Sequence, residues 1–285
     1  MTKSALFVGL ITVDLIYLAQ SPPQNNQKLV ANNYTVAAGG PATNASVTFS
    51  YLGNKSQILG VLGCHPMTQL ITTDLANYQV GIIDLDTNKQ TSPPISSIIV
   101  TESTGERAVI SINAVKTQAN ISSLTPEILE NIDIVLIDGH QMAVSKIIAQ
   151  KAKKQNIPVV IDGGSWKPGF EEILPFVNYA ICSANFYPPE CKNQEDIFNY
   201  LQNFHIPQIA ITQGENPIQY LNYGQRGFIN VPKIQVVDTL GAGDIFHGAF
   251  CHYILQSNFP KSLELASNIA AEACQYFGTR RWMHR

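Results

Sequence analysis

Charged side chains are scarce in this sequence of 285 residues. Asp, Glu, Lys and Arg make up 14% of the chain, against roughly 25% in an average globular protein, and the formal net charge is −3. The excess of basic residues that binds nucleic acid is missing, so no nucleic-acid partner is expected. No apolar run reaches the roughly 18 residues of a membrane span, and Asp14 interrupts the apolar start of the chain. We therefore expect no membrane partner.

Cysteine is also rare, and its positions are widely spaced. The five cysteines form no C-x-x-C pair, and the six histidines show no spacing typical of metal ligands. This pattern excludes a disulfide framework and a zinc site, and we predict no metal-ligating residues. A chain of this length buries a large core without cross-links, and we expect it to fold in the reducing cytoplasm.

Short apolar runs alternate with longer amphipathic stretches, which is typical of βαβ units on a parallel sheet. The runs predict buried strands at residues 5–11, 58–62, 132–137, 159–161 and 209–212. Spacings of three and four residues between apolar positions predict helices at residues 41–52, 144–155 and 260–277. The fold class is therefore α/β.

Two stretches break this alternation. Residues 12–36 and 93–113 are too polar for crossover helices, and in the second stretch apolar and polar residues alternate as in a strand. We predict that they form a small β layer, a lid, inserted in the α/β domain. No repeat or linker divides the chain, so we expect a single domain over residues 1–285.

The stretch from Val236 to Phe246 is the most informative. An extended segment leads into Gly241, Ala242 and Gly243, and an amphipathic helix follows. Backbone N–H groups at such a helix start make an anion site without a lysine. Asp244 lies in the first turn, where an acidic residue is most often only a cap. Beside an anion site the more specific interpretation is a general base that accepts a proton from a hydroxyl attacking a phosphoryl group.

Other phosphate-binding motifs are excluded. The glycines of this stretch are spaced G-x-G-x4-G and lie near the C-terminus, unlike the G-x-G-x-x-G of a dinucleotide fold. The Walker A pattern G-x-x-x-x-G-K-[ST] is absent, which argues against a P-loop NTPase.

A second glycine pair, Gly39 and Gly40, precedes a predicted helix that starts at Pro41. A turn before a helix accounts for these residues. It does not account for Asn44, a poor helix former placed about one turn into the helix, beside glycines that permit a ligand to approach closely.

Together these motifs resemble the two signatures of the ribokinase-like (PfkB) family of carbohydrate kinases. The first is Gly39-Gly40-x-x-x-Asn44-Ala45 and the second is Asp238-Thr239-x-Gly241-Ala242-Gly243-Asp244-x-Phe246. The resemblance covers essentially the whole chain. It is closest to the ketohexokinase-like branch, on Gly9-Leu10-x-x-x-Asp14, Gly105-Glu106-Arg107 and Leu136-Ile137-Asp138-Gly139.

The resemblance implies a doubly wound, mostly parallel sheet flanked by helices, with a small β-sheet lid. It implies transfer of the γ-phosphoryl group of ATP to a hydroxyl of a small sugar, of ketohexose or pentose type. Asp244 would be the base, and Gly241, Ala242 and Gly243 the anion hole. ATP and Mg²⁺ are the implied cofactors, and a need for a monovalent cation is left open.

The remaining site residues are assigned by the same resemblance. The residues expected to bind the sugar are Asp14, Gly39, Gly40, Asn44, Arg107 and Asp138. The residues expected on the nucleotide side are Asn185, Thr212, Gly214, Ser267 and Cys274. A solvated turn charge is an equal alternative for Arg107, and core packing is the simpler alternative for Cys274.

The sequence departs from the family pattern on the nucleotide side. The family motif N-x-x-E is broken, since Pro188 stands three residues after Asn185, and Pro217 replaces the last glycine of T-x-G-x-x-G. Two alternatives therefore stay open: a nucleoside kinase of the same superfamily, and a binding protein without turnover.

The lid also predicts an assembly. A small sheet cannot bury both of its faces by itself, so we expect a homodimer joined through the lids. The alternative is a monomer whose lid packs only on its own α/β domain.

Overall fold

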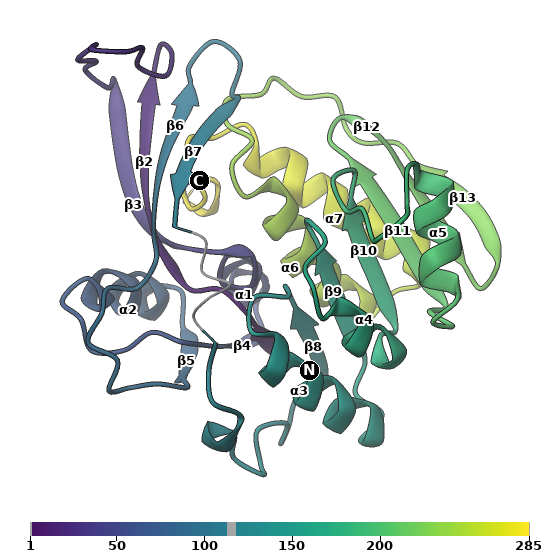
Figure 1. Cartoon of the computed structure of the whole chain (residues 1–285). Helices are drawn as coiled ribbons and strands as arrows, with labels where there is room; N and C mark the ends of the chain where they lie inside the picture. The colour runs from purple at the N-terminus through teal and green to yellow at the C-terminus, as the bar shows by residue number, and fades with distance from the viewer. Residues whose placement is uncertain (1, 113–117, 285) are drawn as a thin grey trace.

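A nine-stranded sheet forms the centre of the computed structural model, which describes residues 2–112 and 118–284 (Figure 1). From one edge to the other its strands are β13 (Gln225–Ile229), β12 (Asn216–Asn222), β11 (Gln208–Gln213), β10 (Tyr179–Ser183), β9 (Val159–Gly163), β8 (Ile134–Ile137), β1 (Ser4–Val8), β4 (Lys55–Gly60) and β5 (Val80–Asp84). Neighbours from β11 to β5 are parallel, whereas β12 and β13 add an antiparallel edge.

The five predicted strands are confirmed as β1, β4, β8, β9 and β11, with bounds that differ by up to three residues. The sequence did not predict β5, β10, β12 and β13. The confirmed strands are mostly central and carry continuous buried runs, such as the four fully buried residues of β8. The antiparallel edge strands mix exposed and buried residues and give a weaker signal.

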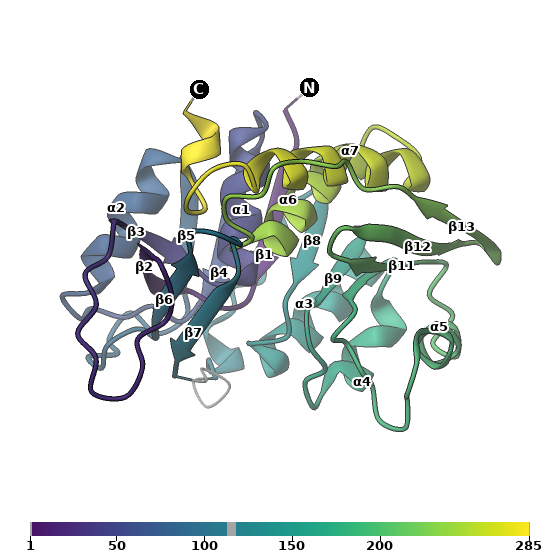
Figure 2. The same ribbon diagram turned by 90° about the horizontal axis from the view of Figure 1, so that it is seen from above.

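Helices cover both faces of this sheet, as the view from above shows (Figure 2). One face carries α1 (Pro41–Tyr51), α6 (Ala242–Ile254) and α7 (Phe259–Ala273), and the other carries α3 (Met142–Lys154), α4 (Phe170–Ile173) and α5 (Gln194–Gln202). A further helix, α2 (Thr68–Asn77), packs beside β5. The doubly wound α/β fold is therefore confirmed.

Alternate residues of β1 contribute to two hydrophobic cores, one on each face of the sheet. Ala5 and Phe7 face the core under α1, α6 and α7, whereas Leu6 and Val8 face the core under α3, α4 and α5. The predicted helix at 260–277 ends earlier, at Ala273, because the chain then turns toward the lid.

The lid is a separate four-stranded sheet in the order β3-β2-β6-β7. Its strands are β2 (Thr12–Ala19), β3 (Asn33–Gly39), β6 (Ile95–Thr101) and β7 (Arg107–Ser111). The pairing of β2 with β6 is parallel and the two outer pairings are antiparallel. The small inserted sheet predicted from the sequence is therefore present, although Asn113, the last residue of the predicted segment, lies outside the described residues.

The two faces of the lid differ. Ile16, Ile98 and Val100 are buried and pack with Phe277 against the α/β layer. The opposite face includes Tyr34, 70% exposed, and Ile110, 76% exposed. Within residues 2–112 and 118–284, no helix combines the length and apolar character needed to cross a membrane.

Candidate active site

The start of α6 is shaped by glycine. Gly241 adopts a left-handed conformation (φ 72°), and a Cβ there would lie 2.8 Å from Thr279 Cγ2. A Cβ on Gly243 would meet no atom within 4 Å, because this residue lines an open cavity. The N–H of Ala242 donates to the Thr239 carbonyl at 3.3 Å, whereas the first-turn N–H groups of Gly243 and Asp244 have no carbonyl inside the helix to bond. Of the three residues predicted for the anion hole, Ala242 thus uses its N–H within the protein, and the first-turn N–H groups left for an anion are those of Gly243 and Asp244.

Asp244 carries a partly buried carboxyl group. Its Oδ2 accepts a hydrogen bond of 2.8 Å from Asn44 Nδ2 on α1. Burial, and next the nearby carboxylate of Asp162, raise the pKa of Asp244 to about 7, against opposing contributions from Asn44, His247 and Arg107. A carboxyl group with this pKa is suited to exchange protons near neutral pH.

Asp162 and His247 support this helix start and were not predicted from the sequence. His247 Nδ1 lies 2.7 Å from the Gly243 carbonyl oxygen and 3.5 Å from Asp162 Oδ2, and its Nε2 lies 3.2 Å from the Ile181 carbonyl oxygen. Asp162 is buried at the carboxyl end of β9. Its position at a strand end was the available signal, since ligands bind there in open α/β sheets.

The glycine pair before α1 is explained by packing within the protein. A Cβ on Gly39 would lie 1.9 Å from Asp14 Oδ2, and one on Gly40 (φ 103°) would lie 2.3 Å from the Leu10 carbonyl oxygen. Asp14 itself is buried, which raises its pKa, and its Oδ1 accepts a hydrogen bond of 2.9 Å from Thr12. The glycines therefore give room to Asp14 and the loop at Leu10.

Both carboxylate oxygens of Asp138 accept hydrogen bonds from backbone N–H groups of the protein. Its Oδ2 accepts from the backbone N–H groups of Leu10 (2.9 Å) and Ala42 (3.2 Å), and its Oδ1 accepts from the His140 N–H (2.9 Å). The His140 ring nitrogen Nδ1 lies 3.1 Å from the same oxygen. Burial works against these partners, but the pKa of Asp138 is lowered to about 2. This geometry does not support the predicted sugar contact, because the carboxylate already organises the loops at Leu10 and Ala42.

Two cavities lie along the carboxyl edge of the sheet. The first, which we call the lid cavity, has a volume of about 420 Å³ between the lid and the loops after β8 and β9. It is lined by Leu10, Thr12, Ser96, Ser111, Ile112, His140, Ser165, Trp166, Lys167 and Pro168. Lys167 thus faces a cavity rather than lying free on a surface loop. Neither Asp14 nor Asn44 is part of that lining, but Asp14 accepts a hydrogen bond from Thr12, which is.

The second, which we call the helix cavity, has a volume of about 540 Å³ beside α6 and α7. It brings together six residues predicted for the phosphate and nucleotide side: Thr212, Gly214, Ala242, Gly243, Ser267 and Cys274. Its walls also include Ile218, Val231, Phe246 and Ala270, an apolar surface that the sequence reasoning missed. Asn185 is exposed beyond β10 and lines neither cavity.

Arg107 connects the lid to the loop before α6. Its Nη1 donates to the carbonyl and hydroxyl oxygens of Thr239, both at 3.3 Å. The Gly105 carbonyl accepts from the Thr239 N–H (3.2 Å) and hydroxyl (3.1 Å). The lid turn therefore packs beside the helix cavity, and its residues Thr104 and Glu106 form part of the cavity wall. Arg107 lies on that side rather than in the lid cavity.

Comparison with known proteins places this chain in one family and one fold. The family model described as "pfkB family carbohydrate kinase" matches residues 2–284. Ribokinase from Lactococcus lactis is 23% identical over 292 residues, covering 99% of this chain and 94% of the relative. Ketohexokinase from Mus musculus is 22% identical over 296 residues, covering 95% and 96%. The structure of Arabidopsis thaliana ribokinase complexed with ribose and ATP superposes with a TM-score of 0.77 at 19% identity, covering both chains fully.

Proposed function

Because this chain belongs to the pfkB family of carbohydrate kinases, we propose that it transfers the γ-phosphoryl group of ATP to a hydroxyl of a small sugar, of ketohexose or pentose type. The observation that carries this proposal is the position of Asp244. Its partly buried carboxyl group lies in the first turn of α6, beside the backbone N–H of Gly243, which lines a cavity of about 540 Å³. A base and an anion site at one helix start are what phosphoryl transfer to a hydroxyl requires.

The helix cavity is the proposed ATP site. Its apolar wall fits a flat base, while Gly243, Thr212 and Gly214 provide backbone and hydroxyl groups near the phosphates. Mg²⁺ binds mainly through phosphate oxygens and water, with one or two protein oxygens. The exposed side chain of Asn185, at the end of β10, is the oxygen donor we propose for it. The ion would neutralise charge on the transferring group.

The lid cavity is the proposed sugar site. Serine and threonine hydroxyls from the lid, together with His140 and Lys167, supply neutral and cationic partners for sugar hydroxyls. Asp14 and Asn44 complete the site on the side facing Asp244. In the reaction Asp244 takes the proton of the attacking hydroxyl, and the N–H groups at the start of α6 stabilise charge on the phosphoryl oxygens. The lid excludes water, which would compete as acceptor.

A nucleoside kinase is the second candidate. Trp166 and Ile112 in the lid cavity provide an apolar surface on which a nucleobase could stack, and a free sugar would use this surface less well. A binding protein without turnover is the third candidate, supported only by the broken N-x-x-E pattern at Pro188.

A coupled ADP-release assay over a panel of pentoses, ketohexoses and nucleosides separates these candidates. We expect ATP-dependent turnover with a sugar, abolished in Asp244→Asn. Turnover only with nucleosides would select the second candidate. Thermal stabilisation by a sugar and a non-hydrolysable ATP analogue, with no ADP released, would select the third.

We propose further that the protein is a homodimer. Each subunit is a single domain, and the two subunits meet through their lids. The outward face of the lid carries Leu15, Tyr17, Tyr34, Val36, Ile99 and Ile110 in register across all four strands. Ile110, Tyr34 and Tyr17 are exposed in the single chain, and a second copy related by a two-fold axis would cover them.

A further inference from the structure

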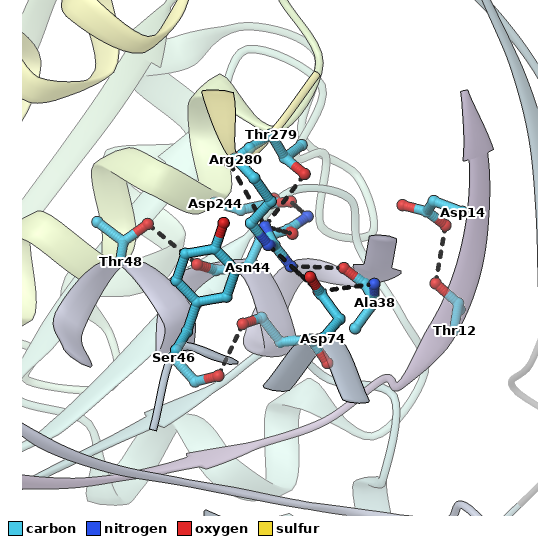
Figure 3. Close-up of polar contacts among 12 residues, drawn as sticks. Thr12, Asp14, Ala38, Asn44, Ser46, Thr48, Asp74, Asp244, Thr279 and Arg280 are labelled. Carbon is cyan, nitrogen blue, oxygen red and sulfur yellow. Dashed lines mark hydrogen bonds and ion pairs between the residues drawn. The ribbon is translucent and has the colours of Figure 1, made fainter. Parts of the chain in front are cut away.

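The segment after α7 places one arginine, Arg280, in the polar network beside Asp244 (Figure 3). Two contacts fix this segment. The Gly278 N–H donates to Asp238 Oδ2 at 2.8 Å, and the indole N–H of the fully buried Trp282 donates to the Thr279 carbonyl at 3.2 Å. The side chain of Arg280 is only 12% exposed. No sequence motif indicated this residue, which is 236 positions away from Asn44.

The guanidinium group joins three parts of the chain. Nη1 donates to Asn44 Oδ1 on α1 (2.9 Å) and to the Thr279 hydroxyl (3.1 Å). Nη2 donates to the Ala38 carbonyl on β3 (2.7 Å) and to Asp74 Oδ2 on α2 (3.2 Å). Asp74 Oδ2 also accepts from the Ala38 N–H at 2.9 Å, so that Arg280, Ala38 and Asp74 are all hydrogen-bonded to one another.

These contacts decide the orientation of the Asn44 amide. A guanidinium group can only donate hydrogen bonds, so the atom of Asn44 that faces Arg280 must be the carbonyl oxygen Oδ1. The Nδ2 group must then face the opposite way, and it donates to Asp244 Oδ2 at 2.8 Å. With the amide turned over, a donor would face Arg280 and an oxygen would face the carboxylate of Asp244.

We infer that Arg280 is a positioning residue for phosphoryl transfer: it fixes the Asn44 amide so that Nδ2 holds one oxygen of Asp244 and leaves the other for the sugar hydroxyl. This inference rests on the proposed function, in which Asp244 is the base. Asn44 is only 3% exposed, so water has little room to replace the contact that Arg280 makes. The base therefore depends on a residue that it does not touch.

The charges around Asp244 give this inference a second readout. Asp162 on β9 raises the pKa of Asp244, whereas the Asn44 hydrogen bond, His247 on α6 and Arg107 on β7 lower it. Without Arg280 the Asn44 amide is free to turn, and the lowering contribution of its N–H is lost. The carboxyl group then needs a higher pH to ionise, so the acidic limb of the kcat profile moves to higher pH.

The test is a double-mutant cycle on kcat and its pH profile. Arg280→Met should lower kcat by about 100-fold, the size of effect expected for a misplaced catalytic group. It should also move the acidic limb of the kcat profile to higher pH. In an Asn44→Ala background the same change should add little, because the amide that Arg280 orients is gone. If Arg280→Met lowers kcat just as much in the Asn44→Ala background, or if the acidic limb of the kcat profile does not move, Arg280 only fastens the C-terminal segment to Asp74.

Two further variants control for folding and for charge. Arg280→Lys keeps the positive charge but not the forked geometry, and it gives the same two readouts, at smaller size, if Arg280→Met does not fold. Arg226→Met removes an arginine that pairs with Glu195 on the surface, far from both cavities, and should leave kcat unchanged. A matching loss there would attribute the effect to a general change in charge or stability.

A titration that needs no turnover separates this inference from the proposed function. The carboxyl carbon of Asp244 can be followed by NMR in the intact protein and in Arg280→Met. An unchanged titration in a protein that phosphorylates sugars would overturn the role of Arg280 and leave the kinase assignment standing. An upward shift in a protein that turns over no substrate would show that Arg280 controls the pKa of Asp244 through Asn44, but it would refute the kinase assignment and with it a role in phosphoryl transfer.

Discussion

The helix cavity and the lid cavity lie on the same edge of the sheet but are built differently. The helix cavity includes one local loop, where the backbone at Gly243 opens α6, although β11, α7 and the lid turn supply the rest of its wall. The lid cavity is assembled from the lid strands and from the loops after β8 and β9. In the proposed function, backbone N–H groups of the loop at Gly243 bind phosphate and side chains bind the sugar. A local motif can encode the first arrangement, whereas the second requires tertiary structure.

Asp244 lies in the first turn of α6, next to Gly243 of the helix cavity, and its removal should have the largest effect. Asp244→Asn keeps the shape of the side chain but cannot accept the proton of the hydroxyl. We expect kcat to fall by about 10² to 10⁴, the usual contribution of a general base, while sugar and ATP still bind. Steady-state kinetics and thermal shifts with each ligand measure this. Turnover close to that of the unaltered protein would remove Asp244 from the mechanism.

The helix cavity is tested next, by Gly243→Val. An added Cβ meets no protein atom, so the side chain would project into the cavity where phosphate is expected. We expect kcat to fall by about 10² to 10³, as when a donor of an oxyanion hole is lost, with the fold intact. Gly81→Val, on strand β5 and outside both cavities, is the matched control. Retained activity in Gly243→Val would mean that the loop is only a helix start.

These two regions also differ in how far the sequence predicted them. Thr212, Gly214, Gly243 and Ser267 were all assigned to the phosphate and nucleotide side by the resemblance, and they do line one cavity although they come from separate segments. On the sugar side, Asp138 and the glycine pair make contacts within the protein and do not line the lid cavity, so their role toward the sugar stays a prediction. Burial and hydrogen-bond saturation arise from tertiary contacts, which no spacing in the sequence reports.

The same distinction applies to the fold. Strands such as β8 carry fully buried apolar runs and were predicted, whereas β12 and β13 were missed because many of their residues are exposed. The buried strand β10 was missed as well. Arg280 was missed for a related reason: an arginine near a chain end has no local signature, and only the folded chain brings it to Asn44. Pairwise long-range contacts of this kind require the structure.

The pH dependence offers a sharper test of Asp244. Its pKa is raised to about 7 in the folded protein, so the carboxyl group is protonated and inactive as a base below that pH. We expect kcat/KM to rise about tenfold between pH 6 and pH 8. The same shift means that the folded state favours the uncharged form. The stability linked to Asp244 is therefore full below its ordinary pKa of 3.8 and is lost as the pH rises through about 7.

Asp244→Asn should for that reason raise the melting temperature at pH 8 and leave it nearly unchanged at pH 4. Differential scanning calorimetry at the two pH values measures this. A flat activity profile between pH 6 and pH 8 would contradict the raised pKa.

The sugar side is tested by Asp14→Ala. The carboxyl group is buried beside Thr12, and removing it would leave sugar hydroxyls and Thr12 without a partner. We expect the KM for sugar to rise about tenfold, as for an unpaired buried polar group, with the KM for ATP nearly unchanged. An equal rise in both constants would contradict the division between the two cavities. Thr101→Ala, at the far end of β6, provides a control within the lid.

The smallest effect is expected on the outward face of the lid. Ile110 is 76% exposed and lies on the face opposite to the buried Ile16 and Ile98. A charge there, Ile110→Glu, should weaken association of two lids and raise the KM for sugar a few-fold, since a loosened lid covers its cavity less well. Phe228→Glu, which places a charge on the exposed edge strand β13, should change neither property. Sedimentation showing a fully active monomer at micromolar concentration would refute the dimer and leave the lid as a cover for its own chain alone.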